Sequence, residues 1–188
     1  MIGYPSNVLV VADYEPPHFE EKIQRRVDFV LSCGDVDFQI LEEIRERFNV
    51  PVFAVKGNHD SRRPFPAFVT DLHLKFVLFR NGLIGGFAGV PGEEGSGNYE
   101  WDDLGASRRL SCFPYVDIFV CHAPLLGLTD RVDSAHLGSE SIRRYVEKVQ
   151  PRFVYHGHVH QGMAAMAGET AVVSVYGAAV YNLTWSSA

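Results

Sequence analysis

The sequence predicts an α/β protein in which two stacked mixed sheets are flanked by helices, a four-layer α-β-β-α sandwich. The first third of the chain alternates short apolar runs with segments of helical periodicity, which is typical of parallel strands joined by crossover helices. The last part alternates small apolar and β-branched residues, which is typical of antiparallel strands. Two packed sheets account for both patterns.

The first third is expected to run strand, helix, strand, helix, strand. Pro16-Pro17 favours the start of the first helix, and apolar residues recur at helical spacing between Phe38 and Phe48 for the second. The expected strands are 7–12, 28–32 and 51–55, and the expected helices are 17–27 and 37–48.

The remaining elements follow from turn and cap signals. Asn81-Gly82 is a two-residue hairpin turn signal, and Ser139 is a typical helix N-cap. We therefore expect strands at 72–79 and 83–90, a glycine-rich loop at 91–97, a helix at 99–110, a strand at 116–121, a helix from 139 to 149, a strand at 153–155, and antiparallel strands within 162–185.

Composition limits the class of protein. The chain has 188 residues, a net charge of −6 and 46% hydrophobic residues, which suits one domain over residues 1–188. Its apolar runs are shorter than the ~18 residues of a membrane span. Three scattered cysteines and no basic residue before Lys22 favour a cytoplasmic protein without a secretory signal. Net acidity argues against stable nucleic-acid binding and against binding to anionic membranes.

Side chains that bind metals fall at the ends of predicted strands. Parallel strands bring their carboxyl ends to one edge of a sheet, where ligands of α/β proteins bind. Three oxygen ligands and three imidazoles meeting there would suit two divalent ions. In an extended backbone, His158 and His160 would point to the same side. The six residues are Asp13, Asp35, Asn58, His122, His158 and His160.

Five short motifs lie at these strand ends. They are Asp13-Tyr14-Glu15, Gly34-Asp35, Gly57-Asn58-His59-Asp60, His122 and Gly157-His158-Val159-His160. In this order the chain resembles the calcineurin-like metallophosphoesterases, whose pattern is Asp-x-His, Gly-Asp, Gly-Asn-His-Asp/Glu, a lone His after a strand, and Gly-His-x-His. The motifs span residues 13–160, and together they are specific. The short loops are similar to the small bacterial form of the family, with a single domain.

The resemblance implies a role for each motif residue. Asp35 would bridge two divalent ions. Asp13, His160 and Glu15 would hold one ion, and the other would be held by Asn58, His122 and His158. Mn²⁺ is the expected metal, with Fe, Zn, Ni and Mg as alternatives. A hydroxide bridging the ions would attack phosphorus, and His59 would be the general acid for the leaving oxygen.

Position 15 departs from the family pattern, because Glu15 stands where the family usually has His. A third carboxylate would favour hard cations such as Mn²⁺, Fe²⁺ or Mg²⁺. Alternatively, Glu15 precedes Pro16-Pro17 and points away from the ion.

The resemblance implies a binuclear metal-dependent phosphoesterase that hydrolyses a phosphodiester or a phosphomonoester. We favour a small diester, such as a nucleotide derivative, because the sequence has no cluster of arginines that could bind the dianion of a terminal phosphate. Arg62 and His136 are candidate substrate contacts. The alternative is a non-catalytic scaffold of the same fold, as in the retromer subunit of this fold family. A DNA nuclease would need a further domain and a positive field.

Replacing Glu15 by histidine should change the metal preference while preserving hydrolysis. The reason is that a neutral ring would replace a carboxylate beside the ion. Metal analysis of the purified variant and of the wild type checks this expectation. If both proteins carried the same ions in the same amounts, Glu15 would not be a ligand.

Overall fold

Two sheets form the centre of the computed structural model, which describes residues 4–14, 18–19, 23–92, 97–131, 133 and 135–185. The first sheet has the strand order β13 (Gly177–Trp185), β1 (Tyr4–Ala12), β2 (Phe29–Ser32), β3 (Val52–Ala54) and β4 (Val69–Asp71). The second has the order β11 (Met163–Ala167), β12 (Thr170–Ser174), β10 (Phe153–His156), β9 (Ile118–Cys121), β6 (Gly82–Phe87) and β5 (Phe76–Phe79). Both sheets are mixed; in the first, β13 runs antiparallel to β1, while β1, β2, β3 and β4 are parallel.

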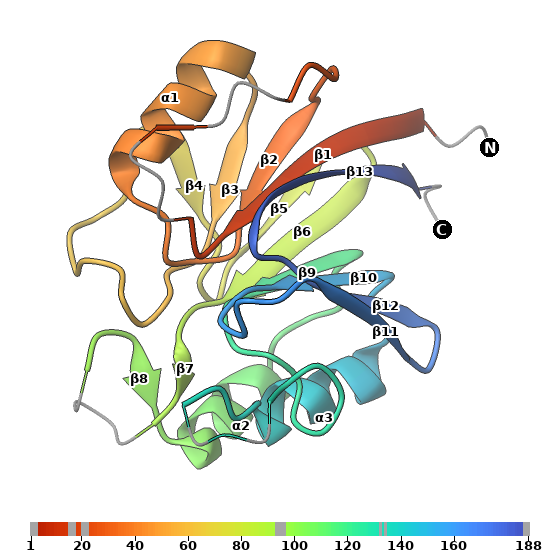
Figure 1. The fold of residues 1–188 in the computed structure, drawn as a ribbon. Helices are drawn as coiled ribbons and strands as arrows, with labels where there is room; N and C mark the ends of the chain where they lie inside the picture. The colour runs from red at the N-terminus through yellow and green to blue at the C-terminus, as the bar shows by residue number, and fades with distance from the viewer. Residues whose placement is uncertain are drawn as a thin grey trace.

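Helices cover the outer faces of the two sheets. Figure 1 shows α1 (Phe38–Phe48) on the first sheet, and α2 (Asp103–Ser111) and α3 (Glu140–Val149) on the second, with both sheets between them. A short parallel pair, β7 (Val90–Pro91) and β8 (Glu100–Trp101), lies beside α2. The predicted arrangement of two stacked sheets with helices outside is therefore confirmed. In the described part of the chain, no helix has the length and apolar character needed to cross a membrane.

The strands of the first sheet are apolar on both faces, and the two faces pack against different layers. Val8 and Val10 of β1 belong to the core between the sheets, whereas Leu9 and Val11 belong to the core under α1. Side chains alternate between the faces of a strand, so a continuous apolar run buries both faces. This packing explains why residues 7–12 could be recognised as a buried strand from the sequence.

Two helices begin at the residues that the sequence indicates. The carboxylate of Asp37 accepts a hydrogen bond from the N–H of Gln39 at 2.8 Å and caps α1. The hydroxyl group of Ser139 accepts from the N–H of Ile142 at 3.0 Å and caps α3. Each cap supplies a partner for an N–H group that the helix itself leaves unpaired.

The helix expected at 17–27 is wrong for the described residues 18–19 and 23–27, which are not helical; the remainder of that range lies outside the described residues. Phe19 is buried against the ring of Phe48, and its N–H donates to the carboxylate of Glu43 at 2.6 Å. Side chains of α1 therefore hold this segment, in place of hydrogen bonds within a helix of its own.

Two other boundaries need correction, and one strand was not expected. Residues 100–101 form β8, and α2 starts only after the cap residue Asp102, whose carboxylate accepts from the N–H of Gly105. Phe79 pairs with Gly82, so the hairpin turn consists of Arg80 and Asn81, and Arg80 has a φ of 55°. The short strand β4 was not expected; its parallel pairing with β3 is a tertiary contact that its three residues do not reveal.

Replacing Ser139 by alanine should lower the free energy of unfolding by about 1–2 kcal/mol. The buried hydroxyl group caps α3 and donates to the Asp103 carboxylate at 2.7 Å, so both interactions would be lost. Urea denaturation of the metal-free protein, followed by circular dichroism, measures the change. Ser107→Ala on α2 is the control, because the Ser107 hydroxyl group makes no hydrogen bond to the described residues. Equal losses in both variants would contradict the expectation.

Candidate metal centre

The metal-binding candidates of the described chain meet where strands of both sheets end. Asp13 directly follows β1, and Asp35 lies three residues after β2. From the second sheet, His122 directly follows β9, and His158 lies two residues after β10. Asn58 comes four residues after β3. The predicted convergence at the carboxyl ends of strands is therefore present.

His122 is the centre of this group and is fully buried. Its Nδ1 donates to the backbone carbonyl of Cys33 at 2.7 Å. A carbonyl can only accept, so Nδ1 carries a proton and Nε2 is free to act as a ligand. Nε2 lies 3.1 Å from Oδ2 of Asp35 and 3.1 Å from Oδ1 of Asn58.

Two buried carboxylate oxygens, Oδ1 of Asp13 and Oδ2 of Asp35, accept no hydrogen bond from a described backbone N–H. Each instead faces an imidazole Nε2, that of His160 at 3.7 Å and that of His122 at 3.1 Å. The other oxygen of each carboxylate is held by a backbone N–H, from His158 at 2.8 Å and from His59 at 2.9 Å. One donor atom each from Asp13, Asp35 and His122 lies within 4.8 Å of the other two. Buried carboxylates without compensating charge are costly, so this donor set fits a divalent cation.

The pKa values of these groups are shifted from their usual values by burial and by the charges of one another. Burial disfavours the charged form of His122, but the carboxylates of Asp35 and Asp13 outweigh it and raise its pKa to about 9. Burial raises the pKa of Asp13. For Asp35, the effect of burial is outweighed by His122 and the N–H of His59, so its pKa is lowered. In the absence of a metal, a proton on His122 therefore compensates part of the carboxylate charge.

Glycine is required at two positions behind His122. A Cβ on Gly34, whose φ is 96°, would lie 2.6 Å from Nδ1 of His122. A Cβ on Gly57 would lie 2.1 Å from Oδ1 of Asp35. The glycines of the Gly-Asp and Gly-Asn-His-Asp motifs therefore leave the space in which the imidazole ring and the Asp35 carboxylate approach the backbone.

Four candidate ligands have left-handed backbone conformations, which are uncommon outside glycine. The φ angles are 48° for Asp13, 54° for Asp35, 71° for His158 and 51° for His160. The extended backbone expected between His158 and His160 is therefore wrong. Their rings still lie on the same side, because both contact the ring of His136, with centroids 5.3 Å and 5.6 Å away. Strain of this kind concentrates at functional sites.

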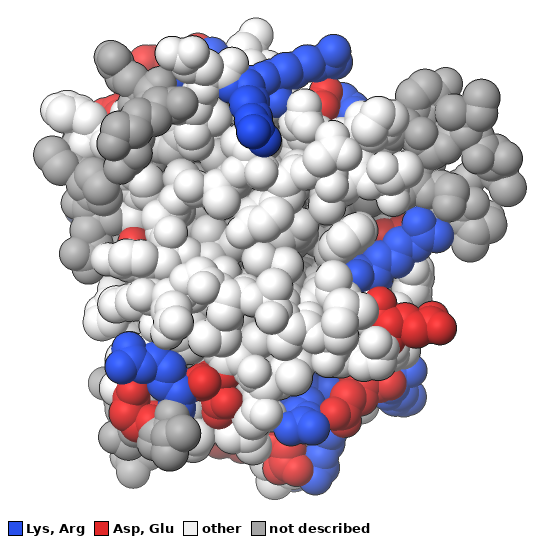
Figure 2. Space-filling model, turned by 45° about the vertical axis from the view of Figure 1, so that its right-hand side comes forward, with Lys and Arg blue, Asp and Glu red and all other residues white. Residues whose placement is uncertain are grey.

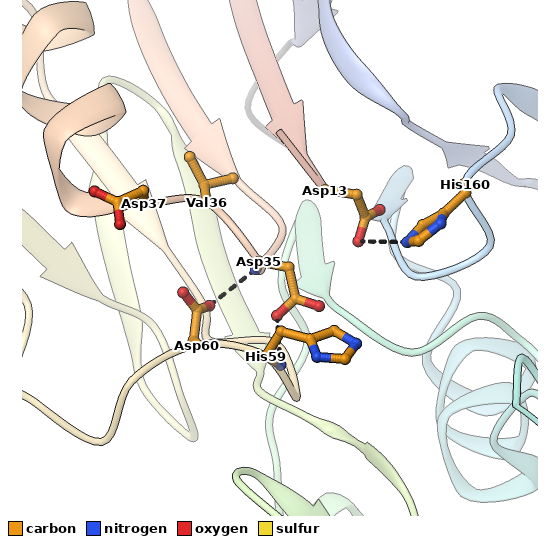
Figure 3. A pocket seen from close by; sticks show the side chains of 7 residues that line it. All are labelled: Asp13, Asp35, Val36, Asp37, His59, Asp60 and His160. Atoms are coloured by element: carbon orange, nitrogen blue, oxygen red, sulfur yellow. Dashed lines mark hydrogen bonds and ion pairs between the residues drawn. The ribbon is translucent and has the colours of Figure 1, made fainter. Parts of the chain in front are cut away.

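A pocket of about 310 Å³ opens beside Asp13 and Asp35, and Figure 3 shows its lining. His160 Nε2 lies 3.7 Å from Oδ1 of Asp13 on one side. On the other side lies His59, whose exposed ring has Nε2 3.3 Å from Nδ2 of Asn58. The pocket is lined by Asp13, Asp35, Val36, Asp37, His59, Asp60 and His160.

Asp60 supports this loop, a role that the sequence pattern did not predict. Its Oδ2 accepts from the backbone N–H groups of Asp35 at 2.9 Å and Gly57 at 2.7 Å. The carboxylate therefore fixes Asp35 relative to the Gly-Asn-His-Asp loop. Its position as the fourth residue of that motif is the signal that could have indicated this role.

The two predicted substrate contacts lie in different surroundings. His136 lies in the imidazole cluster, and its Nδ1 is 2.6 Å from Oδ1 of Asp133. Arg62 donates to Oδ1 of Asn98 at 2.9 Å and to the carbonyl of Gly97 at 3.2 Å. Arg62 is absent from the described lining of the pocket. Glu15, the remaining predicted ligand, lies outside the described residues.

Comparisons with known proteins agree with this fold. The crystal structure of TT1561 from Thermus thermophilus aligns with a TM-score of 0.64 and 14% identity, over 96% of this chain and 99% of that one. The phosphopantetheinyl hydrolase PptH from Mycobacterium tuberculosis aligns with a TM-score of 0.58 and 16% identity, over 93% and 91%. No curated protein matches the sequence. The family model of the calcineurin-like phosphoesterases matches residues 13–162, and the chain therefore belongs to that family.

Proposed function

We propose that this protein is a binuclear metal-dependent phosphoesterase that hydrolyses a phosphodiester or phosphomonoester bond of a small substrate. The observation that carries the proposal is the approach of the buried carboxylates of Asp13 and Asp35 to the buried imidazole of His122, with one donor atom of each within 4.8 Å of the others. Membership of the calcineurin-like phosphoesterase family supports the same reaction. Mn²⁺ is the metal we expect, with Fe, Zn, Ni and Mg as alternatives.

The contacts support two ligand groups that share Asp35. Asp13 and His160 would hold one ion, since their donor atoms lie 3.7 Å apart. Asn58 and His122 would hold the other, together with Nδ1 of His158, because Nε2 of His158 donates to the carbonyl of Ala135 at 2.8 Å. When bound, paired divalent ions supply positive charge that activates water and stabilises the phosphoryl oxygens.

His59 is the residue we propose as general acid. Its backbone N–H is anchored by Asp35, and its exposed ring lines the pocket without belonging to the Asp13–Asp35–His122 group. From there the imidazolium would donate its proton to the leaving oxygen of the substrate. His136 lies beside His158 and His160 and would contact the substrate from the opposite side.

The charge of the pocket favours a diester over a monoester. The described lining contains four aspartates and no lysine or arginine. Two divalent ions would offset the charge of Asp13 and Asp35, so the preference depends on the missing basic side chains. A monoester carries one more charged oxygen than a diester, and the described lining offers that oxygen no lysine or arginine. On the face drawn in Figure 2, lysines and arginines lie at the margins next to acidic residues and form no continuous basic patch among the residues described there. The absence of basic side chains from the described lining of the pocket supports a small-molecule substrate over nucleic acid.

The alternative, a scaffold without catalytic activity, has less support. A scaffold does not need buried carboxylates close together or left-handed backbone at four candidate ligands, and both are costly. Among the described residues, Asp13, Asp35 and His122 bring donor atoms within 4.8 Å of one another, which a metal site requires and a scaffold does not.

Replacing Asp35 by asparagine should lower metal affinity and turnover by more than about 100-fold. Loss of a residue that only hydrogen-bonds to a metal ligand typically costs 10–100-fold, and Asp35 is itself a proposed ligand. Calorimetric titration with Mn²⁺ and hydrolysis of bis-p-nitrophenyl phosphate measure both effects. Asp117→Asn is the matched control, because this carboxylate lies before β9 at the opposite end of the sheet and accepts from the N–H of Leu83. Unchanged Mn²⁺ binding in Asp35→Asn would contradict the proposed centre.

Replacing His59 by alanine should lower kcat by about 10²–10⁴-fold, the usual contribution of a general acid. The metal content should remain that of the wild type, because His59 is not among the proposed ligands. Stopped assays with bis-p-nitrophenyl phosphate and elemental analysis of the same samples separate the two effects. His18→Ala, which removes an exposed histidine paired with Glu43, is the control. Loss of metal from the His59 variant would reassign this residue as a ligand.

A further inference from the structure

Tyr176 places an exposed aromatic ring next to the candidate metal centre. Its ring stacks on that of His160, with centroids 5.4 Å apart and an interplanar angle of 27°. Tyr176 is nevertheless 53% exposed, so much of its ring remains open to solvent. His160 in turn lines the pocket.

The backbone holds this ring in a defined place. Tyr176 lies in the two-residue connection between β12 of the second sheet and β13 of the first. The preceding residue, Val175, is buried, and its N–H donates to the carbonyl of His156 at 2.8 Å. Gly177 follows with a φ of 79° and starts β13. The ring is therefore positioned before any ligand binds, so little conformational entropy is lost on binding.

The described lining of the pocket offers few contacts to the organic part of a substrate. Its described lining consists of carboxylates, two imidazoles and Val36, with no basic side chain. The affinity for the group esterified to phosphate must then come from apolar or stacking contacts. An exposed, preordered aromatic ring supplies such a contact to any planar base.

We propose that Tyr176 is a substrate-binding residue that stacks on a nucleobase, so that the substrates of this centre are esters of nucleotides. The proposal rests on the phosphoesterase function proposed above and adds the substrate class to it. Tyr176 stacks on His160, which lies 3.7 Å from Asp13, so a base on the free face of Tyr176 would lie one ring further from the carboxylate.

The rival explanation is that Tyr176 only orients the ring of His160. In that case, removal of Tyr176 would weaken the centre for every substrate alike. A nucleobase contact instead affects only substrates that carry a base. Two substrates that differ solely in the base therefore separate the two roles.

The test compares the methyl ester of adenosine 5′-phosphate with the methyl ester of ribose 5-phosphate, using the full chain loaded with Mn²⁺. In Tyr176→Ala, the ratio of kcat/KM for the adenine substrate to that for the base-free substrate should fall at least about fivefold, mainly through KM. Tyr176→Phe should retain the wild-type ratio. Tyr115→Ala is the control: Tyr115 is 43% exposed and donates to Asp117 at the other end of β9. An unchanged ratio in Tyr176→Ala would overturn the proposal.

A binding measurement tests the contact between Tyr176 and a nucleobase independently of hydrolysis. Saturation-transfer NMR of AMP with the metal-free protein should show saturation of the adenine protons in the wild type and its loss in Tyr176→Ala. If the wild type hydrolyses neither ester, the phosphoesterase function fails and the NMR result alone decides the role of Tyr176. Absence of adenine saturation in the wild type would overturn the nucleobase contact.

Discussion

The close approach of two buried carboxylates to one buried imidazole is the constraint on which the rest of this structure depends. Asp13 and Asp35 each leave one oxygen without a backbone N–H donor among the described residues, and both lie next to His122. Charged groups in such surroundings require compensation by opposite charge. The carboxylates of Asp35 and Asp13 raise the pKa of His122 to about 9, so a proton on its ring compensates part of their charge. A divalent cation would compensate this charge more completely, with Nε2 of His122 as a ligand in place of the proton.

Backbone geometry holds the donors in this unfavourable arrangement. N–H groups of His59 and His158 bind one oxygen of each carboxylate. The other oxygen of Asp35 faces Nε2 of His122, and that of Asp13 faces Nε2 of His160. Asp60 ties the loops of Asp35 and Gly57 together. This arrangement lowers the stability of the fold but holds the donor atoms in position, as expected where function competes with stability.

Most of the strands and the helices α1 and α3 could be predicted from the sequence, because they depend on local signals. Buried strands are recognisable from apolar runs, and each motif follows such a run. Contacts between distant segments could not be predicted. The segment containing Phe19 depends on the side chains of α1, and the left-handed backbone at His158 and His160 depends on packing against Asp13 and His136. Tyr176 carries no motif, and only the fold brings it to His160.

The centre also draws on both sheets, and the two sheets contribute different chemistry. The proposed oxygen ligands Asp13, Asp35 and Asn58 follow strands of the first sheet, while the candidate imidazoles of His122 and His158 follow strands of the second. The distance between these two sets is fixed by the core between the sheets, in which Ala12 and Cys33 pack with Val120. Close-packed interiors deform little, so the spacing of the sheets sets the distances among the donor atoms. A cation held by ligands from both sheets would in turn bind only the native arrangement and would stabilise the packing that forms it.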